Sequence, residues 1–217
     1  KSGMMNGAAL TAALFFGIYR VDSRVPNPSR HFVFWYCTLA VLTVLAYWSG
    51  LDGPFLFDDV TNILRHEPLR INHLSVDALW RAAWALESGP LKRPIAYLSF
   101  ALNYYFAGGY AAPAFKATNL AIHLLNALLV ATLAWRMARV VWPADSQRRA
   151  WMACLGGAVF AFHPLALSPV LYVVQRMASL STLFVLAALL CFLAARDRVA
   201  TVARRRAACG WLLPGGL

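Results

Sequence analysis

The stretch ATNLAIHLLNALLVATLAWRMARVVW, residues 117–142, decides the fold expected for this chain. It follows Lys116, and its first charged residues, Arg136 and Arg139, lie near its far end. Crossing about 30 Å of hydrocarbon takes roughly 20 helical residues. The stretch is long enough and apolar enough for that, so it predicts a transmembrane helix.

The rest of the chain repeats this pattern. Hydrophobic residues make up 60% of the sequence, charged residues make up 13%, and the mean hydropathy is +0.57. A soluble domain would not need this much apolar surface. We expect transmembrane helices at 31–50, 117–142, 150–167 and 168–196. The predicted fold class is therefore an all-α, polytopic transmembrane helix bundle.

The segments between and around these helices are expected to lie outside the hydrocarbon. The largest is the loop 51–116, and residues 143–149 form a short cytoplasmic loop. Residues 197–217 form a basic cytoplasmic loop and the start of a further helix. Residues 1–30 form a cytoplasmic or membrane-surface segment. Its apolar run 4–19 is a surface helix, a short extra span or part of a targeting segment.

The distribution of arginine predicts the orientation, because the cytoplasmic flanks of membrane helices hold the excess of basic residues. Three clusters fall on one side if the helices alternate: Arg20, Arg24 and Arg30; Arg136, Arg139, Arg148 and Arg149; and Arg196, Arg198, Arg204, Arg205 and Arg206. We expect that side to be the cytoplasm, so 51–116 faces the periplasm or an equivalent outer space. The net charge of +11 then reflects contact with anionic membrane lipids and not with nucleic acid.

Two interfacial helices are expected within the outer loop. In residues 75–86, apolar side chains that include Trp80 and Trp84 recur at helical spacing, and Ser75 is a suitable N-cap. A second helix starts at Pro94 and stops at Gly108. These helices either lie in the headgroup zone as a shelf on the outer leaflet or only cap the bundle.

Polar residues form stripes on two of the predicted spans. Asn119, His123 and Asn126 share one face of the second span. They either bind a ligand or form hydrogen bonds between helices. Tyr172, Arg176 and Ser179 form a similar stripe on the fourth span, which places Arg176 about two turns inside the membrane. A guanidinium there either binds an anion such as a lipid phosphate or extends to the outer interface.

The adjacent carboxylates Asp58 and Asp59 follow an apolar stretch, 54–57, that would hold them near the membrane surface. Carboxylates at an apolar boundary can have raised proton affinity, which suits a general base. They can also bind a divalent cation. The remaining alternative is a solvated loop feature without a chemical role.

Four strings of this sequence together resemble a known family. They are GPFLFDDVTNI (53–63), RPIAYLSFALNYYFAG (93–108), FKATNLAIHLLNALL (115–129) and HPLALSPVLYVVQRM (163–177). In this order and spacing they resemble bacterial multi-span proteins of the GT-C glycosyltransferase superfamily. Those proteins are similar to the eukaryotic transmembrane and tetratricopeptide-repeat (TMTC-like) O-mannosyltransferases. The resemblance covers residues 32–196 and implies a location in the bacterial inner membrane.

This resemblance implies roles for particular residues. Asp58 or Asp59 would be the base that deprotonates an acceptor hydroxyl. The donor would be a polyprenyl-phosphate sugar, whose leaving phosphate needs the positive charge of Arg93 and Arg176. His163 in the His-Pro motif would contact donor or acceptor, and the other candidate substrate-binding residues are Asn119, His123 and Tyr172. The resemblance implies inversion at the anomeric carbon and a secreted protein or glycan as acceptor.

Two departures from the family pattern bear on these expectations. The chain has Ser168 where eukaryotic relatives usually carry Glu, which weakens the case for a metal site. The superfamily usually has many more helices, so we expect this chain to be an N-terminal portion. The alternative function is a non-catalytic membrane subunit or assembly factor that packs against another membrane protein.

Overall fold

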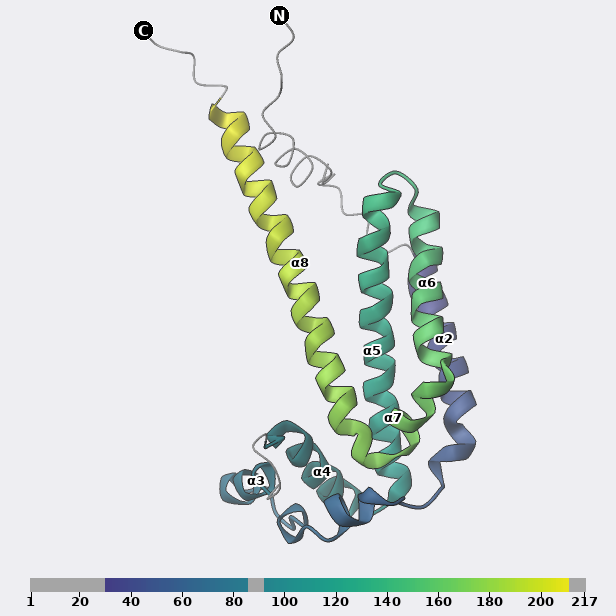
Figure 1. Cartoon of the computed structure of the whole chain (residues 1–217), viewed down its shortest axis with the longest axis vertical. Coiled ribbons are helices and arrows are strands. Elements are labelled where there is room, and N and C mark those ends of the chain that lie inside the picture. Colours follow the sequence, from purple (N-terminus) through teal and green to yellow (C-terminus); the bar gives the residue numbers. More distant parts are fainter. Residues whose placement is uncertain (1–29, 86–91, 211–217) are drawn as a thin grey trace, which may run out of the picture.

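The computed structural model describes residues 30–85 and 92–210, and within them it contains helices and turns without strands (Figure 1). The longer helices are α2 (Arg30–Leu51), α3 (Val76–Ala83), α4 (Pro94–Ala107), α5 (Ala112–Val141), α6 (Ser146–Phe162) and α8 (Arg176–Gly210). The shorter ones are the π-helical turn η1 (Val60–Leu64), the 3-10 turns η2 (Glu67–Leu69), η3 (Pro164–Ala166) and η4 (Val173–Gln175), and helix α7 (Leu167–Leu171). The predicted all-α fold class is confirmed.

Three helical stretches are long and apolar enough to cross a membrane: Val33–Leu51, Ala112–Val141 and Val173–Val199. A fourth span is possible if Ser146–Phe162 and Pro164–Leu171 act together, although they meet at a bend of 56°. Helices α2 and α5 cover the stretches expected from the sequence. Helix α5 begins a few residues before 117 because Pro113 suits the first turn of a helix.

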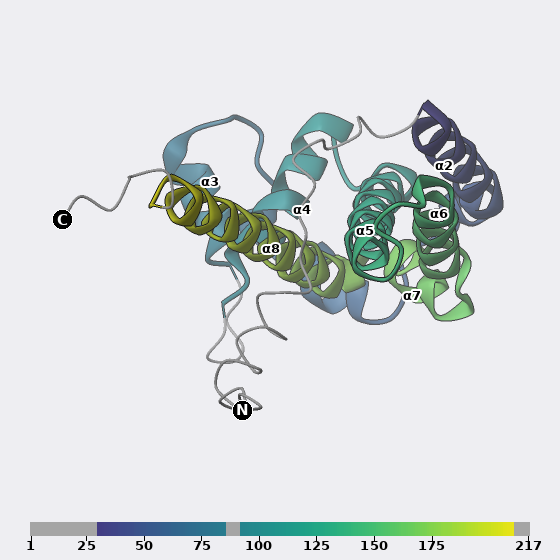
Figure 2. The same cartoon turned by 90° about the horizontal axis from the view of Figure 1, so that it is seen from above.

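Helix α5 lies at the centre of the bundle and contacts α2, α6, α7 and α8 (Figures 1 and 2). Glycine allows α6 to approach it closely. A Cβ atom added at Gly157 would lie 3.2 Å from the Ala131 Cβ and 3.3 Å from the Leu39 Cδ2. Small residues at such contacts let helix backbones pack by van der Waals contact inside a membrane.

The structure corrects the expected boundary between the third and fourth spans. Helix α6 ends at Phe162, and three short turns occupy 164–175 before α8 begins at Arg176. Pro164 and Pro169 lack the N–H that a continuous helix needs, which accounts for the break. Tyr172 therefore precedes the helix, and Arg176 is its first residue and not two turns inside it.

Helix α8 also continues through 197–210, where a loop was expected. Most of these residues are Ala, Arg or Val, and no Pro interrupts them. Alanine and arginine are good helix formers, so the helix propagates beyond its apolar part. The start of a further helix, expected within 197–217, is thus part of α8 up to Gly210, and residues 211–217 lie outside the described residues.

The two helices expected in the outer loop both form. The Ser75 Oγ accepts a hydrogen bond from the Ala78 N–H at 3.2 Å, as predicted for an N-cap. Helix α4 starts at Pro94 and ends at Gly108, which adopts a left-handed conformation with a φ of +68° that suits glycine. Helix α3 packs on α4, while Trp80 remains 64% exposed. Residues 86 and 87 lie outside the described residues.

The basic clusters that the structure describes lie at the end of the bundle opposite the outer loop (Figure 1). There the Arg136 Nη1 lies 3.3 Å from the Asp197 Oδ2, an ion pair that joins α5 to α8. The Arg149 guanidinium stacks over the Trp135 ring at 5.3 Å. Residues 1–29, which include the run 4–19, lie outside the described residues.

Candidate functional site

The buried carboxylate of Asp59 joins the outer loop to the turn before α8. Its oxygen atoms accept hydrogen bonds from the N–H groups of Leu56 at 3.0 Å, Val173 at 3.4 Å and Val174 at 2.7 Å. Burial raises the pKa of Asp59, and these three N–H groups and the charge of Lys116 oppose that effect only in part. Asp59 therefore fixes two loops that are more than a hundred residues apart in the sequence.

Asp58, by contrast, is exposed. Its N–H donates to the Tyr172 hydroxyl at 3.0 Å. The preceding residue, Phe57, has a φ of +38°, which is strained for a residue with a side chain. The two adjacent carboxylates thus differ: that of Asp59 is buried and bound to backbone N–H groups, and that of Asp58 is exposed.

Arg176 is fully buried and surrounded by protein. Its Nε donates to the Asn119 Oδ1 at 2.7 Å, its Nη2 donates to the Phe115 carbonyl at 2.8 Å, and its Nη1 donates to the Ser99 carbonyl at 3.2 Å. The guanidinium also stacks on the ring of Phe100 at 4.6 Å. This geometry favours a structural role over contact with a lipid phosphate, and it excludes the alternative that the side chain extends to the interface.

Asn119 holds the turn before α8 from the opposite side to Asp59. Its Nδ2 lies 3.4 Å from the Pro169 carbonyl oxygen, 3.3 Å from that of Tyr172 and 3.4 Å from that of Val173. Its Oδ1 is occupied by Arg176. Asn119 is therefore a link between helices, which is one of the two alternatives that its position in the sequence left open.

Arg93 reaches the same region from α4. It is exposed, and its Nη1 lies 2.9 Å from the Met177 Sδ, one residue beyond Arg176. The structure thus gathers Asp58, Asp59, Arg93, Asn119, Tyr172 and Arg176 around residues 172–177. Of the two predicted phosphate-binding arginines, Arg93 is the accessible one.

Lys116 belongs to this region and was not singled out in the sequence. Its side chain is buried, and its Nζ donates to the carbonyls of Gly50 at 3.2 Å and Gly53 at 2.8 Å. It therefore fixes the end of α2 against the start of α5, just before the acidic pair. The available signal was a lysine at the edge of an apolar span, which usually needs a partner.

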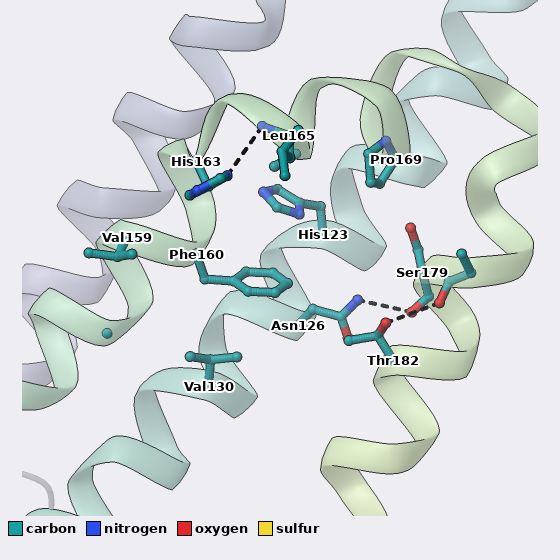
Figure 3. Close-up of a pocket in the computed structure, with 13 residues that line it drawn as sticks. His123, Asn126, Val130, Val159, Phe160, His163, Leu165, Pro169, Ser179 and Thr182 are labelled. Carbon is teal, nitrogen blue, oxygen red and sulfur yellow. Dashed lines mark hydrogen bonds between the residues drawn. The ribbon is translucent and has the colours of Figure 1, made fainter.

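His123 and His163 line a different feature, a groove of about 490 Å³ between α5, α6 and α8 (Figure 3). The His123 Nε2 lies 3.1 Å from the Ala161 carbonyl oxygen, and the Asn126 Nδ2 donates to the Ser179 carbonyl at 2.9 Å. These contacts connect neighbouring helices. His163 is exposed at the end of the groove, and its Nδ1 accepts the Leu165 N–H at 3.2 Å. Neither aspartate of the acidic pair lines the groove.

The described residues contain no group of three or more His, Cys, Asp or Glu side chains that could hold a metal ion. In the acidic pair, only Asp58 presents an accessible carboxylate, since the oxygen atoms of Asp59 face backbone N–H groups. A divalent cation at this site stays a prediction, and no chemical step below depends on one.

Comparisons with known proteins give relatives of one kind. The chain is 32% identical over 161 residues to protein O-mannosyl-transferase TMTC3 of Mus musculus, which is 71% of this chain and 16% of that protein. It is 26% identical over 156 residues to protein O-mannosyl-transferase TMTC4 of Homo sapiens, or 67% of this chain and 21% of that protein. It is also 29% identical over 150 residues to protein O-mannosyl-transferase Tmtc2 of Drosophila melanogaster, which is 64% of this chain and 14% of that protein.

The chain thus spans about a sixth of the length of the mouse relative. No family model matches it, and no solved structure matches it. The relatives are thus protein O-mannosyl-transferases, and the apolar helices of this chain are those of an integral membrane protein.

Proposed function

We propose that this chain is part of a GT-C type membrane glycosyltransferase that transfers a sugar from a polyprenyl-phosphate donor to a hydroxyl group of a protein or glycan. Two observations support the proposal. The relatives named above are O-mannosyl-transferases. The exposed Asp58 and the exposed Arg93 also come from separate parts of the outer loop to residues 172–177, the bend before α8 and its first residues.

In the proposed reaction, Asp58 accepts the proton of the acceptor hydroxyl as its oxygen atom attacks the anomeric carbon. The bond between that carbon and the phosphate oxygen breaks, and the electron pair leaves on the phosphate. A single displacement of this kind inverts the anomeric configuration. The guanidinium of Arg93 stabilises the charge that develops on the phosphate.

The other residues of the region support this arrangement. Asp59 fixes the loop that carries Asp58, and Arg176 fixes the turn that faces it. We keep His163, exposed at the end of the groove, as a candidate contact for donor or acceptor. His123 and Asn119 are assigned to contacts between helices.

The location of the reaction follows from the arginine distribution. The basic ends of α5, α6 and α8 suit a cytoplasmic side, and the outer loop then lies on the opposite side. We place that loop in the periplasm of a bacterial inner membrane, because the sequence motifs resemble bacterial proteins. The lipid tail of the donor would stay in the outer leaflet.

A second candidate is a non-catalytic membrane subunit that packs against another membrane protein. The observation that favours it is the use of Arg176, Asn119 and His123 for internal packing and not for an open ligand site. It predicts a partner that co-purifies in fixed stoichiometry.

The test uses the full-length gene product in lipid nanodiscs with labelled polyprenyl-phosphate mannose and a set of peptide and glycan hydroxyl acceptors. We expect transfer of the label and a product whose anomeric configuration, read by NMR, is opposite to that of the donor. Absence of transfer to every acceptor, with a membrane partner in fixed stoichiometry, would favour the subunit instead.

A further inference from the structure

Tyr172 does not lie where the sequence placed it. The sequence put it on a stripe of a membrane span and suggested contact with substrate. In the structure it lies in the bend between α7 and α8, and its hydroxyl accepts the Asp58 N–H at 3.0 Å. Tyr172 thus directly contacts the backbone of the proposed base.

The backbone that carries Tyr172 is held from two sides. Asn119 lies within hydrogen-bond distance of the Tyr172 and Val173 carbonyls, at 3.3 and 3.4 Å. Asp59 accepts the Val174 N–H at 2.7 Å. Arg176 fixes Asn119 in turn through the 2.7 Å hydrogen bond to its Oδ1. Because its backbone is held in this way, Tyr172 is a fixed reference point, and its hydroxyl has a defined position relative to the loop that carries Asp58.

Asp58 needs such a reference point because its side chain is exposed, although Asp59 fixes the backbone next to it. Phe57 is 84% exposed and has a φ of +38°, so the backbone just before Asp58 is strained and its side chain makes few contacts. An exposed aspartate on such a loop would otherwise sample several rotamers. A general base must lie within hydrogen-bond reach of the proton it removes.

We propose that Tyr172 is a positioning residue whose hydroxyl orients Asp58, and that it does not bind the substrate itself. This inference rests on the proposed function, in which Asp58 is the base. The phenol accepts the Asp58 N–H with its oxygen lone pair and thereby fixes the backbone from which the carboxylate projects.

The test is Tyr172→Phe in the full-length protein in nanodiscs, which removes one oxygen atom and keeps the ring. We expect kcat to fall roughly ten- to a hundredfold, because a misplaced catalytic group costs that much, while KM stays within about twofold. A raised KM with an unchanged kcat would show substrate contact and overturn the proposal.

Tyr36→Phe is the matched control. The Tyr36 hydroxyl donates to the Leu124 carbonyl at 2.6 Å between α2 and α5, so this variant also loses a tyrosine hydroxyl that links two elements. It does not touch the acidic loop. We expect its kcat and KM to match those of the unmodified protein.

Amide hydrogen exchange separates this inference from the proposed function. In Tyr172→Phe, exchange of the Asp58 N–H within the segment 56–60 should accelerate by about fivefold or more, because this N–H loses its acceptor. Tyr36→Phe should leave that segment unchanged. Unchanged exchange in Tyr172→Phe would overturn the positioning role, whereas absence of transferase activity in the unmodified protein would overturn only the proposed function.

Discussion

The Arg176 Nε donates a 2.7 Å hydrogen bond to the Asn119 Oδ1, which joins the first residue of α8 to the outer part of α5. Around this bond, the guanidinium donates to two backbone carbonyls and stacks on the ring of Phe100. The same asparagine faces the carbonyls of the turn before α8. Arg176 thus holds the site together from its buried part, whereas Asp58 and Arg93 are exposed.

Replacing Arg176 with methionine should therefore destabilise the protein. The variant leaves the Phe115 carbonyl and the Asn119 Oδ1 buried without their donor, so we expect a loss of about 2–4 kcal/mol. The measurement is thermal unfolding in detergent. Arg198→Gln, at an exposed position of α8, is the control and should change stability little. Equal melting temperatures for both variants would show that the buried guanidinium does not hold this region together.

The pH dependence of stability should report on Asp59. Because burial raises its pKa in the folded protein, Asp59 keeps its proton at a pH where the unfolded chain, near its ordinary value of 3.8, has lost it. This difference in protonation stabilises the folded state. The stabilisation is complete below the unfolded value and declines as the pH rises through the raised pKa of the folded state. The Asp59→Asn variant should lack this decline. Unfolding curves measured across this acidic range test the direction of the change in stability. A contribution of Asp59 to stability that increases with pH would contradict the prediction.

Close packing of α6 on α5 gives a prediction outside the site. In Gly157→Leu, the new side chain would meet Ala131 and Leu39, whose atoms lie 3.2 and 3.3 Å from a Cβ at this position. We expect a loss of about 1–3 kcal/mol from overpacking. Thermal unfolding measures it, with Ala121→Leu at an exposed position of α5 as the control. A Gly157→Leu protein as stable as the control would show that the two helices are not packed as described.

Much of the fold could be predicted from local signals. The apolar run at 117–142 marks α5, and Ser75, Pro94 and Gly108 mark where the outer helices start or stop. These signals act within a few residues of the boundary, so one sequence is enough to read them. Hydropathy gives no comparable signal at 163–175, because that bend also contains many apolar residues.

The site was harder to predict because its contacts join distant segments. The sequence shows that Asp58 and Asp59 are adjacent, but not that one faces backbone N–H groups 114 and 115 residues away. The partners of Arg176 come from α4 and α5. The sequence does not show that these helices lie next to Arg176, so it leaves anion binding open for this residue. A stripe of polar residues shows that partners exist, not whether they are protein or ligand.

The central claim is that the exposed member of the acidic pair is the base, and one measurement tests it most directly. It is the initial rate of labelled sugar transfer by full-length Asp58→Asn, compared with Asp52→Asn, which alters another exposed carboxylate of the same loop. The account predicts a loss of at least about a hundredfold in Asp58→Asn and a rate within about twofold of the unmodified enzyme in Asp52→Asn. Transfer by folded Asp58→Asn at the rate of the Asp52→Asn control would contradict it.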